Sequence, residues 1–232
     1  NKKKLGAAVS AAFVMMGLAL APAAMAATSA PATSQATSAA DARFKDIYTK
    51  EWQWRIAERL ARDDNAPNAH PGYARVDAAA QEARRVYWAG ILKELDAIAP
   101  AALSPAERIN FAVYRAQIAA LHDAQRFREY EQPVNADTAF WSDVAYAARR
   151  TPKNADEYRN YLAMLEGLPA YFDQELDNMR AGLARGFTPP KVTLAGREGT
   201  LTSVLDAKTP QDVVFYNPFR QMPAAMPAAE QE

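Results

Sequence analysis

The clearest helix start in the chain is the tetrapeptide Ser104-Pro105-Ala106-Glu107. Serine can cap a helix, and proline suits the first helical position because the N–H that it lacks would have no partner there. A glutamate three residues after the cap can accept a hydrogen bond from the serine N–H, which completes a capping box. The sequence therefore predicts a helix that begins at Pro105. Its expected buried face consists of Ile109, Val113, Ala116, Ala120, Ala124 and Phe127.

Two more helices are predicted before this one, from apolar residues that recur three or four positions apart. The buried face of the first consists of Phe44, Ile47, Tyr48, Trp52, Ile56 and Leu60. The buried face of the second consists of Val76, Ala80, Ala83, Tyr87, Ile91, Leu95 and Ile98. The first helix should end near Asp63-Asp64-Asn65, and the second at Pro100.

The chain that follows is predicted to be irregular from Pro133 to Pro152, apart from a short helix over residues 140–146. Asn154 should cap a fourth helix, and Leu168-Pro169 should break the chain before a fifth, which stops at Gly186. The inward residues are expected to be Tyr158, Tyr161, Leu162 and Leu165, and then Phe172, Leu176, Met179 and Leu183. Because no segment alternates with a period of two, the predicted fold class is all-α, a multi-helix array.

The first 26 residues have the composition of a secretory signal peptide. Three lysines precede an apolar run from Leu5 to Ala21, and Pro22 and Ala24-Met25-Ala26 then form a small-residue cleavage site. An uncleaved membrane helix is the alternative, but the run is rich in Ala and Gly and has no second basic flank. We expect cleavage after Ala26 and a periplasmic or secreted protein that is no longer attached to the membrane.

The mature chain has the composition of a globular protein without a polyanionic partner. Loss of the three signal lysines leaves 24 basic and 27 acidic residues, a net charge of −3, so no footprint for nucleic acid remains. Residues 27–42, mostly Ala, Thr, Ser, Pro and Gln, are expected to form a low-complexity linker before a helical domain over residues 43–232. The last residues, Met226 to Glu232, resemble the first turn of a helix, so we expect a truncated chain; a disordered acidic tail is the alternative.

Neither histidine of the chain lies in a motif for metal binding. His70 precedes Pro-Gly and is most simply part of a turn, and His122 is expected to form a solvated surface pair with Asp123. The His-Glu-x-x-His zinc signature is absent, and the spacing of Asp63, Asp64 and the acidic cluster around residue 175 gives no reason to expect that they converge with a histidine.

The remaining candidates for chemistry also favour a structural interpretation. Asp173, Glu175 and Asp177 are expected to lie on a solvated helix face, with Asp177 paired to Arg180. Ser142-Asp143 has no positioned histidine, and Gly196-Arg197-Glu198-Gly199 lacks the lysine of a phosphate loop and is expected to be a turn or a helix interruption. The aromatic residues Phe140, Trp141 and Tyr146 are expected in the core rather than on a ligand-binding surface. No catalytic, cofactor-binding or metal-binding residue is predicted.

Several segments resemble the amino-terminal half of one bacterial family. They are Leu103 to Arg108, Tyr114-Arg115, Tyr158 to Leu168 with Pro169 and Tyr171, Met179 to Lys191, and Asn217-Pro218-Phe219. The family is domain of unknown function 885 (DUF885), and the resemblance extends over roughly Phe44 to Glu232, with Arg180 to Lys191 its most specific part. None of these motifs is catalytic.

The resemblance implies a long, mostly helical, exported zinc-dependent peptidase of the gluzincin type. Its His-Glu-x-x-Pro-Gly-His-like motif would lie in the carboxy-terminal half, bind zinc and activate water for attack on a peptide substrate. This chain would then be the amino-terminal portion, inactive alone, without a cofactor of its own. Its helices would form one wall of a helical shell around the substrate channel and pack against the missing half. The alternatives are a periplasmic helical module that binds a peptide or protein partner through its aromatic stripe, and a structural domain that became independent.

Overall fold

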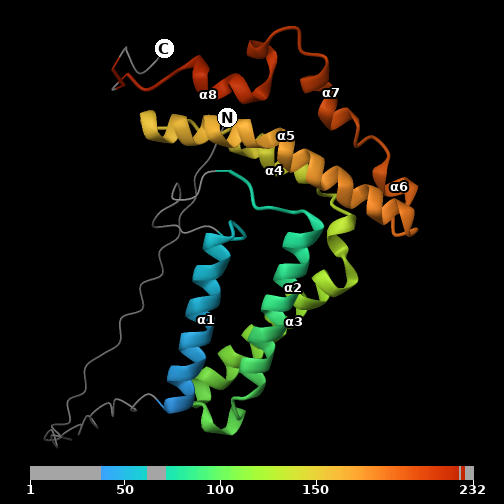
Figure 1. The fold of residues 1–232 in the computed structure, drawn as a ribbon. Coiled ribbons are helices and arrows are strands. Elements are labelled where there is room, and N and C mark those ends of the chain that lie inside the picture. The colour runs from blue at the N-terminus through green and yellow to red at the C-terminus, as the bar shows by residue number, and fades with distance from the viewer. Residues whose placement is uncertain (1–37, 62–71, 225, 228–232) are drawn as a thin grey trace, which may run out of the picture. The chain divides into compact units, whose positions relative to one another are not determined.

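The computed structural model describes residues 38–61, 72–224, 226 and 227 (Figure 1). Regular structure in these residues is helical, apart from one isolated antiparallel bridge between Val134 and Ala139. The α-helices are α1 (Ala39–Ala57), α2 (Ala78–Asp96), α3 (Pro105–Phe127), α4 (Phe140–Ala147), α5 (Ala155–Ala184), α6 (Lys191–Leu194), α7 (Gly199–Leu205) and α8 (Asn217–Arg220). The short 3-10 helices are η1 (Pro100–Ala102), η2 (Glu129–Glu131), η3 (Pro210–Asp212) and η4 (Val214–Tyr216). The all-α prediction is confirmed, while the signal peptide, its cleavage site, Asp63, Asp64 and His70 lie outside the described residues.

The main core lies among α1, α2 and α3, and α2 and α3 pack side by side (Figure 1). Its buried members are Phe44, Ile47, Trp88, Ile91, Leu95, Ile98, Leu103, Phe111 and Ile118. Two of them, Ile98 and Leu103, lie in the short connection from α2 to α3, so two side chains anchor that connection in the core.

The start of α3 is where the sequence predicts it, but the capping box is not completed as expected. Ser104 Oγ accepts a hydrogen bond from the Glu107 N–H, and Pro105 is the first helical residue. The Ser104 N–H donates to Asp41 of α1 at 2.9 Å, where Glu107 was expected to accept. This hydrogen bond lowers the pKa of the Asp41 carboxyl. A carboxylate 63 positions away in the sequence thus ties two helix starts together.

The first helix begins earlier than predicted. Ser38 caps α1 by accepting a hydrogen bond from the Asp41 N–H at 2.9 Å, so residues 39–42 of the expected linker are helical. The low-complexity composition of this stretch does not prevent helix formation because alanine is the best helix former and serine is a good cap.

The predicted break at Pro169 is wrong, because α5 is a single helix from Ala155 to Ala184 with the proline inside it. Proline removes one backbone hydrogen bond, but tertiary contacts of the residues before and after it can outweigh this local cost. Before the proline, Tyr158 and Tyr161 are buried, and after it Glu175 and Asn178 are buried. The predicted cap at Asn154 and the predicted stop at Gly186, whose φ is +73°, are confirmed.

The aromatic residues of α5 hold the segment that carries α8. The Tyr158 hydroxyl donates to Pro218 O at 2.6 Å, and the Tyr161 hydroxyl donates to Phe215 O at 2.9 Å. The Phe219 ring lies 5.5 Å from the Tyr158 ring and 5.8 Å from the Tyr161 ring, measured between centroids. Burial raises the pKa of Tyr161 to about 12. The segment Asn217-Pro218-Phe219 therefore has a packing role.

The buried faces of α3 and α5 differ from the prediction. On α3, Phe111 and Ile118 are buried, whereas Ile109 is 69% exposed and Val113 and Phe127 are also exposed. On α5, Leu162, Leu176 and Leu183 are exposed, whereas Glu175, Asn178 and Gly182 are buried. Trp52 on α1 and Ala83 on α2 were likewise expected inside and are exposed. In each case hydrogen-bonded polar side chains or other apolar side chains occupy the inner face.

Candidate functional site

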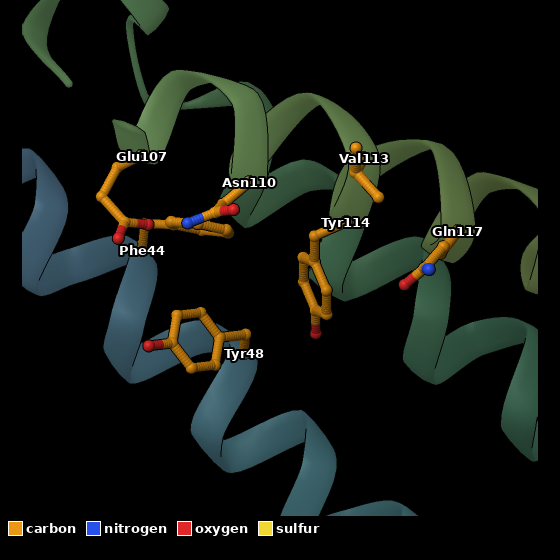
Figure 2. A pocket seen from close by; sticks show the side chains of 7 residues that line it. All are labelled: Phe44, Tyr48, Glu107, Asn110, Val113, Tyr114 and Gln117. Atoms are coloured by element: carbon orange, nitrogen blue, oxygen red, sulfur yellow. The ribbon is translucent and has the colours of Figure 1, made fainter. Parts of the chain in front are cut away.

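A pocket of about 310 Å³ lies between α1 and α3 (Figure 2). Phe44 and Tyr48 come from α1, one turn apart, and face the pocket because residues four apart share a helix face. The other lining residues, all from α3, are Glu107, Asn110, Val113, Tyr114 and Gln117. Phe44 is 1% exposed and forms the floor, so the pocket combines an aromatic base with polar side chains.

The three rings of the pocket are arranged edge to face. The Phe44 centroid lies 5.1 Å from that of Tyr48 and 5.8 Å from that of Tyr114, and the two tyrosine rings are 6.2 Å apart at an interplanar angle of 65°. Rings in this orientation attract one another through their quadrupoles, which stabilises a defined arrangement. The pocket is therefore built from side chains that hold each other in place.

A buried carboxylate beside the pocket fixes one of these rings. Glu51 is 1% exposed and accepts hydrogen bonds from Arg55 Nε at 2.5 Å, Trp88 Nε1 at 3.0 Å and the Tyr114 hydroxyl at 3.0 Å. Burial is the main cause that raises the pKa of Tyr114, and the negative charge of Glu51 raises it further. The Tyr114 hydroxyl therefore stays protonated and acts as a hydrogen-bond donor. Glu51 thus links α1, α2 and α3 and orients the Tyr114 ring.

A second polar cluster joins the start of α2 to α5. The Gln174 side-chain oxygen accepts hydrogen bonds from the N–H groups of Val76 and Asp77, at 2.8 and 3.1 Å. Asn178 donates to Val76 O at 2.7 Å. The buried Arg84 donates to the Arg75 carbonyl and to Gln81 Oε1. These bonds satisfy backbone groups that precede a helix, so the cluster has a clear structural role.

Glu175 lies in this second cluster, contrary to its expected place on a solvated face. It is buried, and desolvation raises the pKa of its carboxyl, although hydrogen bonds with Tyr171 and Asn178 and the charge of Arg84 oppose the shift. Its neighbours in sequence behave as predicted, because Asp173 is exposed and Asp177 pairs with Arg180 at 2.7 Å.

Replacing Glu175 with glutamine should change how stability depends on pH. When the pKa of a carboxyl is higher in the folded state than in the unfolded state, its protonated form favours folding. This contribution to stability is complete below the unfolded-state pKa, about 4.3, and is lost as the pH rises through the folded-state pKa. The urea midpoint of Glu175→Gln should therefore improve relative to the unmodified chain as the pH rises above about 4. The exposed variant Asp177→Asn is the control; an equal pH trend in both variants would contradict the burial argument.

A third cluster joins the end of α5 to η2. The buried Glu131 pairs with Arg185, and Arg128 also lies near it, at 3.4 Å. Arg185 further donates to Phe127 O at 3.1 Å and stacks on Phe187, 4.1 Å from the ring centroid. Arg185 and Phe187 belong to the most distinctive stretch of the sequence, Arg180 to Lys191, so the structure assigns that stretch a packing role.

The other residues considered as candidates in the sequence do not converge on one site within the described ranges. His122 is paired with Asp123 at 3.4 Å as expected, but its side chain is only 19% exposed, so it is less solvated than predicted. Phe140 packs edge to face on Phe172, as expected for a core residue, whereas Tyr146 is exposed. Residues 196–198 form a turn between α6 and α7, as expected, with Gly196 at a φ of +80°, whereas Gly199 already begins α7. Among the described residues, no group of three or more His, Cys, Asp or Glu side chains is placed to hold a metal ion.

Sequence reasoning missed the buried charged residues that organise the structure. Glu51 lies four residues after Ile47 and seven after Phe44, so its position within the apolar stripe of α1 was a usable signal. Arg84 offers a similar signal, because it lies four residues before Trp88 and seven before Ile91 on α2. Glu131 carries no such signal, because it lies in a short 3-10 helix and pairs with Arg185, 54 positions away.

Comparison with known proteins identifies one family. The family model described as a bacterial protein of unknown function (DUF885) matches residues 70–232. The match begins after α1, so the resemblance noted from residue 44 is supported from residue 70 onward. No protein with a curated description and no solved structure matches the chain. None of the helices in the described ranges has the length and apolar character needed to cross a membrane.

Proposed function

The chain belongs to the DUF885 family of bacterial proteins, and from this we propose that it is the amino-terminal portion of an exported zinc-dependent peptidase. The resemblance described above supplies the activity: the zinc motif and the general base would lie in a carboxy-terminal half. The helices of this chain would form one wall of the channel that admits a peptide substrate. The proposal includes export to the periplasm or beyond, with removal of the first 26 residues.

The observation that carries the proposal is the exposure of an apolar face on α5. Leu162, Leu176 and Leu183 are spaced by multiples of seven positions, so they share one helix face, and all three are exposed. Leu183 is 70% exposed. Several large aliphatic side chains on one face are typical of a surface that another part of a protein covers. A carboxy-terminal half packed on this face would account for them.

The residues described here do not fit a zinc site. His122 lies beside a single carboxylate, that of Asp123, and a hydrolytic zinc site needs about three protein ligands and a water. We therefore assign no step of hydrolysis to side chains of this chain. Their role in the proposal is to bind and orient the substrate.

The alternative is a helical module that binds a peptide or protein partner without hydrolysing it. The pocket between α1 and α3 favours this alternative, because it offers an aromatic floor and polar walls without any zinc-dependent chemistry. The two proposals differ in one expectation. Only the peptidase proposal requires a longer reading frame that encodes the zinc motif.

The decisive experiment compares this chain with the reading frame extended beyond Glu232 in the source genome. We expect the extended protein, recovered from the periplasm with Ala27 as its first residue, to contain about one zinc per chain and to cleave peptides until a chelator is added. The 232-residue chain should do neither. Hydrolysis by the short chain that is lost in the double variant His70→Ala, His122→Ala, without unfolding, would refute the proposal. A stop codon directly after Glu232 would favour the binding module.

A further inference from the structure

We propose that the pocket between α1 and α3 binds the arginine side chain of a peptide. The inference concerns recognition alone, so it holds whether or not the complete protein hydrolyses its ligand. It rests on three features of the pocket: the arrangement of the rings, the acceptors around them, and the apolar surface beside them.

The rings form a site that suits a cation. Tyr48 and Tyr114 are 6.2 Å apart and inclined by 65°, and Phe44 closes the base of the space between them. Figure 2 shows the two tyrosine rings on either side of one open space. A cation in that space can lie within about 6 Å of both tyrosine centroids, the distance at which cation–π attraction is appreciable.

The Glu51 carboxylate strengthens the attraction between the Tyr114 ring and a cation. The Tyr114 hydroxyl donates a hydrogen bond to Glu51 at 3.0 Å, and this polarises the phenol so that its ring face becomes more electron-rich. The same bond removes the rotational freedom of the ring. Because the Glu51 charge is already paired with Arg55, it acts on the ligand through Tyr114.

The acceptors of the pocket match a guanidinium group better than an ammonium group. Glu107 brings a carboxylate to the edge of the pocket, and Asn110 and Gln117 bring amide oxygens (Figure 2). A guanidinium is flat, stacks on aromatic rings and presents five N–H donors in a plane, whereas an ammonium is a compact point charge. At about 310 Å³ the pocket is at the small end of ligand sites, which suits one side chain.

The surface beside the pocket indicates that the arginine belongs to a peptide. Val113 lines the pocket and is exposed, and Ile109, one turn before it on α3, is exposed as well. An aliphatic residue next to the arginine could cover these two side chains. A free small cation would leave them in water, so the proposed ligand is an arginine with an aliphatic neighbour.

The test compares N-acetyl-leucyl-arginine amide with the same peptide containing citrulline, which has the same shape but no charge. Binding to the 232-residue chain is followed by calorimetry and by the ring resonances of Tyr48 and Tyr114. We expect the arginine peptide to bind at least about tenfold more tightly than the citrulline peptide. Glu107→Gln should abolish most of this preference, and Tyr48→Ala should weaken binding of the arginine peptide. Glu166→Gln, on the exposed face of α5, is the matched control and should leave both affinities unchanged.

Several outcomes would overturn the inference. Equal affinity for the two peptides would show that charge is not recognised, and no saturable binding would show that the pocket is not a site. Unchanged arginine affinity in both Glu107→Gln and Tyr48→Ala, with helix content intact by circular dichroism, would place binding elsewhere. Tighter binding of tetramethylammonium than of the arginine peptide would indicate a small-cation site. None of these results depends on zinc or on hydrolysis, so they test this inference separately from the peptidase proposal.

Discussion

Replacing Glu51 with alanine should lower the free energy of unfolding by about 3–5 kcal/mol, because removing one member of a buried charged network leaves its partners without compensation. Arg55, Trp88 and Tyr114 each donate to this carboxylate, and they lie on three different helices. In the variant, an indole N–H, a phenol and a partly buried guanidinium lose their acceptor, and a cavity forms in the core. Urea unfolding followed by circular dichroism would measure the loss.

Two further variants make the Glu51 result interpretable. Asp46→Ala removes an ion pair of the same i, i+4 spacing on the same helix, but Asp46 and Lys50 are both exposed, so the midpoint should change little. Glu51→Gln keeps an acceptor oxygen and should lose less stability than the alanine variant. If Glu51→Ala does not fold at all, the glutamine variant still measures the effect. Equal midpoints for Glu51→Ala and Asp46→Ala would show that the buried network contributes no net stability.

Gly182→Ala should destabilise the protein by about 1–3 kcal/mol, the usual effect of forcing extra atoms into a packed site. A Cβ atom at this position would lie 2.8 Å from the Glu131 carbonyl oxygen and 2.9 Å from the Phe187 carbonyl oxygen. Both contacts are with backbone atoms, which cannot rotate aside as a side chain can. The η2 segment would have to move away from α5, which would also disturb the pair between Glu131 and Arg185.

Gly90→Ala is the matched control for Gly182→Ala. Gly90 lies inside α2, and a Cβ there would meet no atom within 4 Å. Alanine is the better helix former, so this variant should gain up to about 1 kcal/mol. Opposite signs for the two variants in urea unfolding are therefore expected. Two stabilised variants would mean that the approach of η2 to Gly182 is looser than the structure places it.

The predicted helix ends were reliable where a cap or a left-handed glycine marked them. Ser104 begins α3, Asn154 begins α5 and Gly186 ends it, all as expected. Such signals act within one turn of the chain, and the residues that satisfy them lie next to them in the sequence. Pro169 is the exception, because its local preference is opposed by tertiary contacts along the whole of α5.

The candidate site was only partly accessible to sequence reasoning. Phe44 and Tyr48 were recognised as one face of a helix, but Tyr114 was not recognised as their neighbour. Val113 was placed inside and is exposed beside the pocket. The pocket requires α1 and α3 to lie against each other in one register. The pattern of a single helix does not contain that information.

The sequence by itself determined the all-α class, the starts of α3, α4 and α5 and the stop at Gly186, because capping and helix propensity depend on residues a few positions apart. Only the tertiary structure decided which faces are buried. Glu51 contacts Trp88 across 37 positions, and Gln174 contacts Val76 across 98. A charged or polar side chain can be buried when such partners satisfy it, and an apolar one can stay exposed when they occupy the inner face. The choice is made by the packing of distant helices, where hydrogen-bond satisfaction competes with hydrophobic burial.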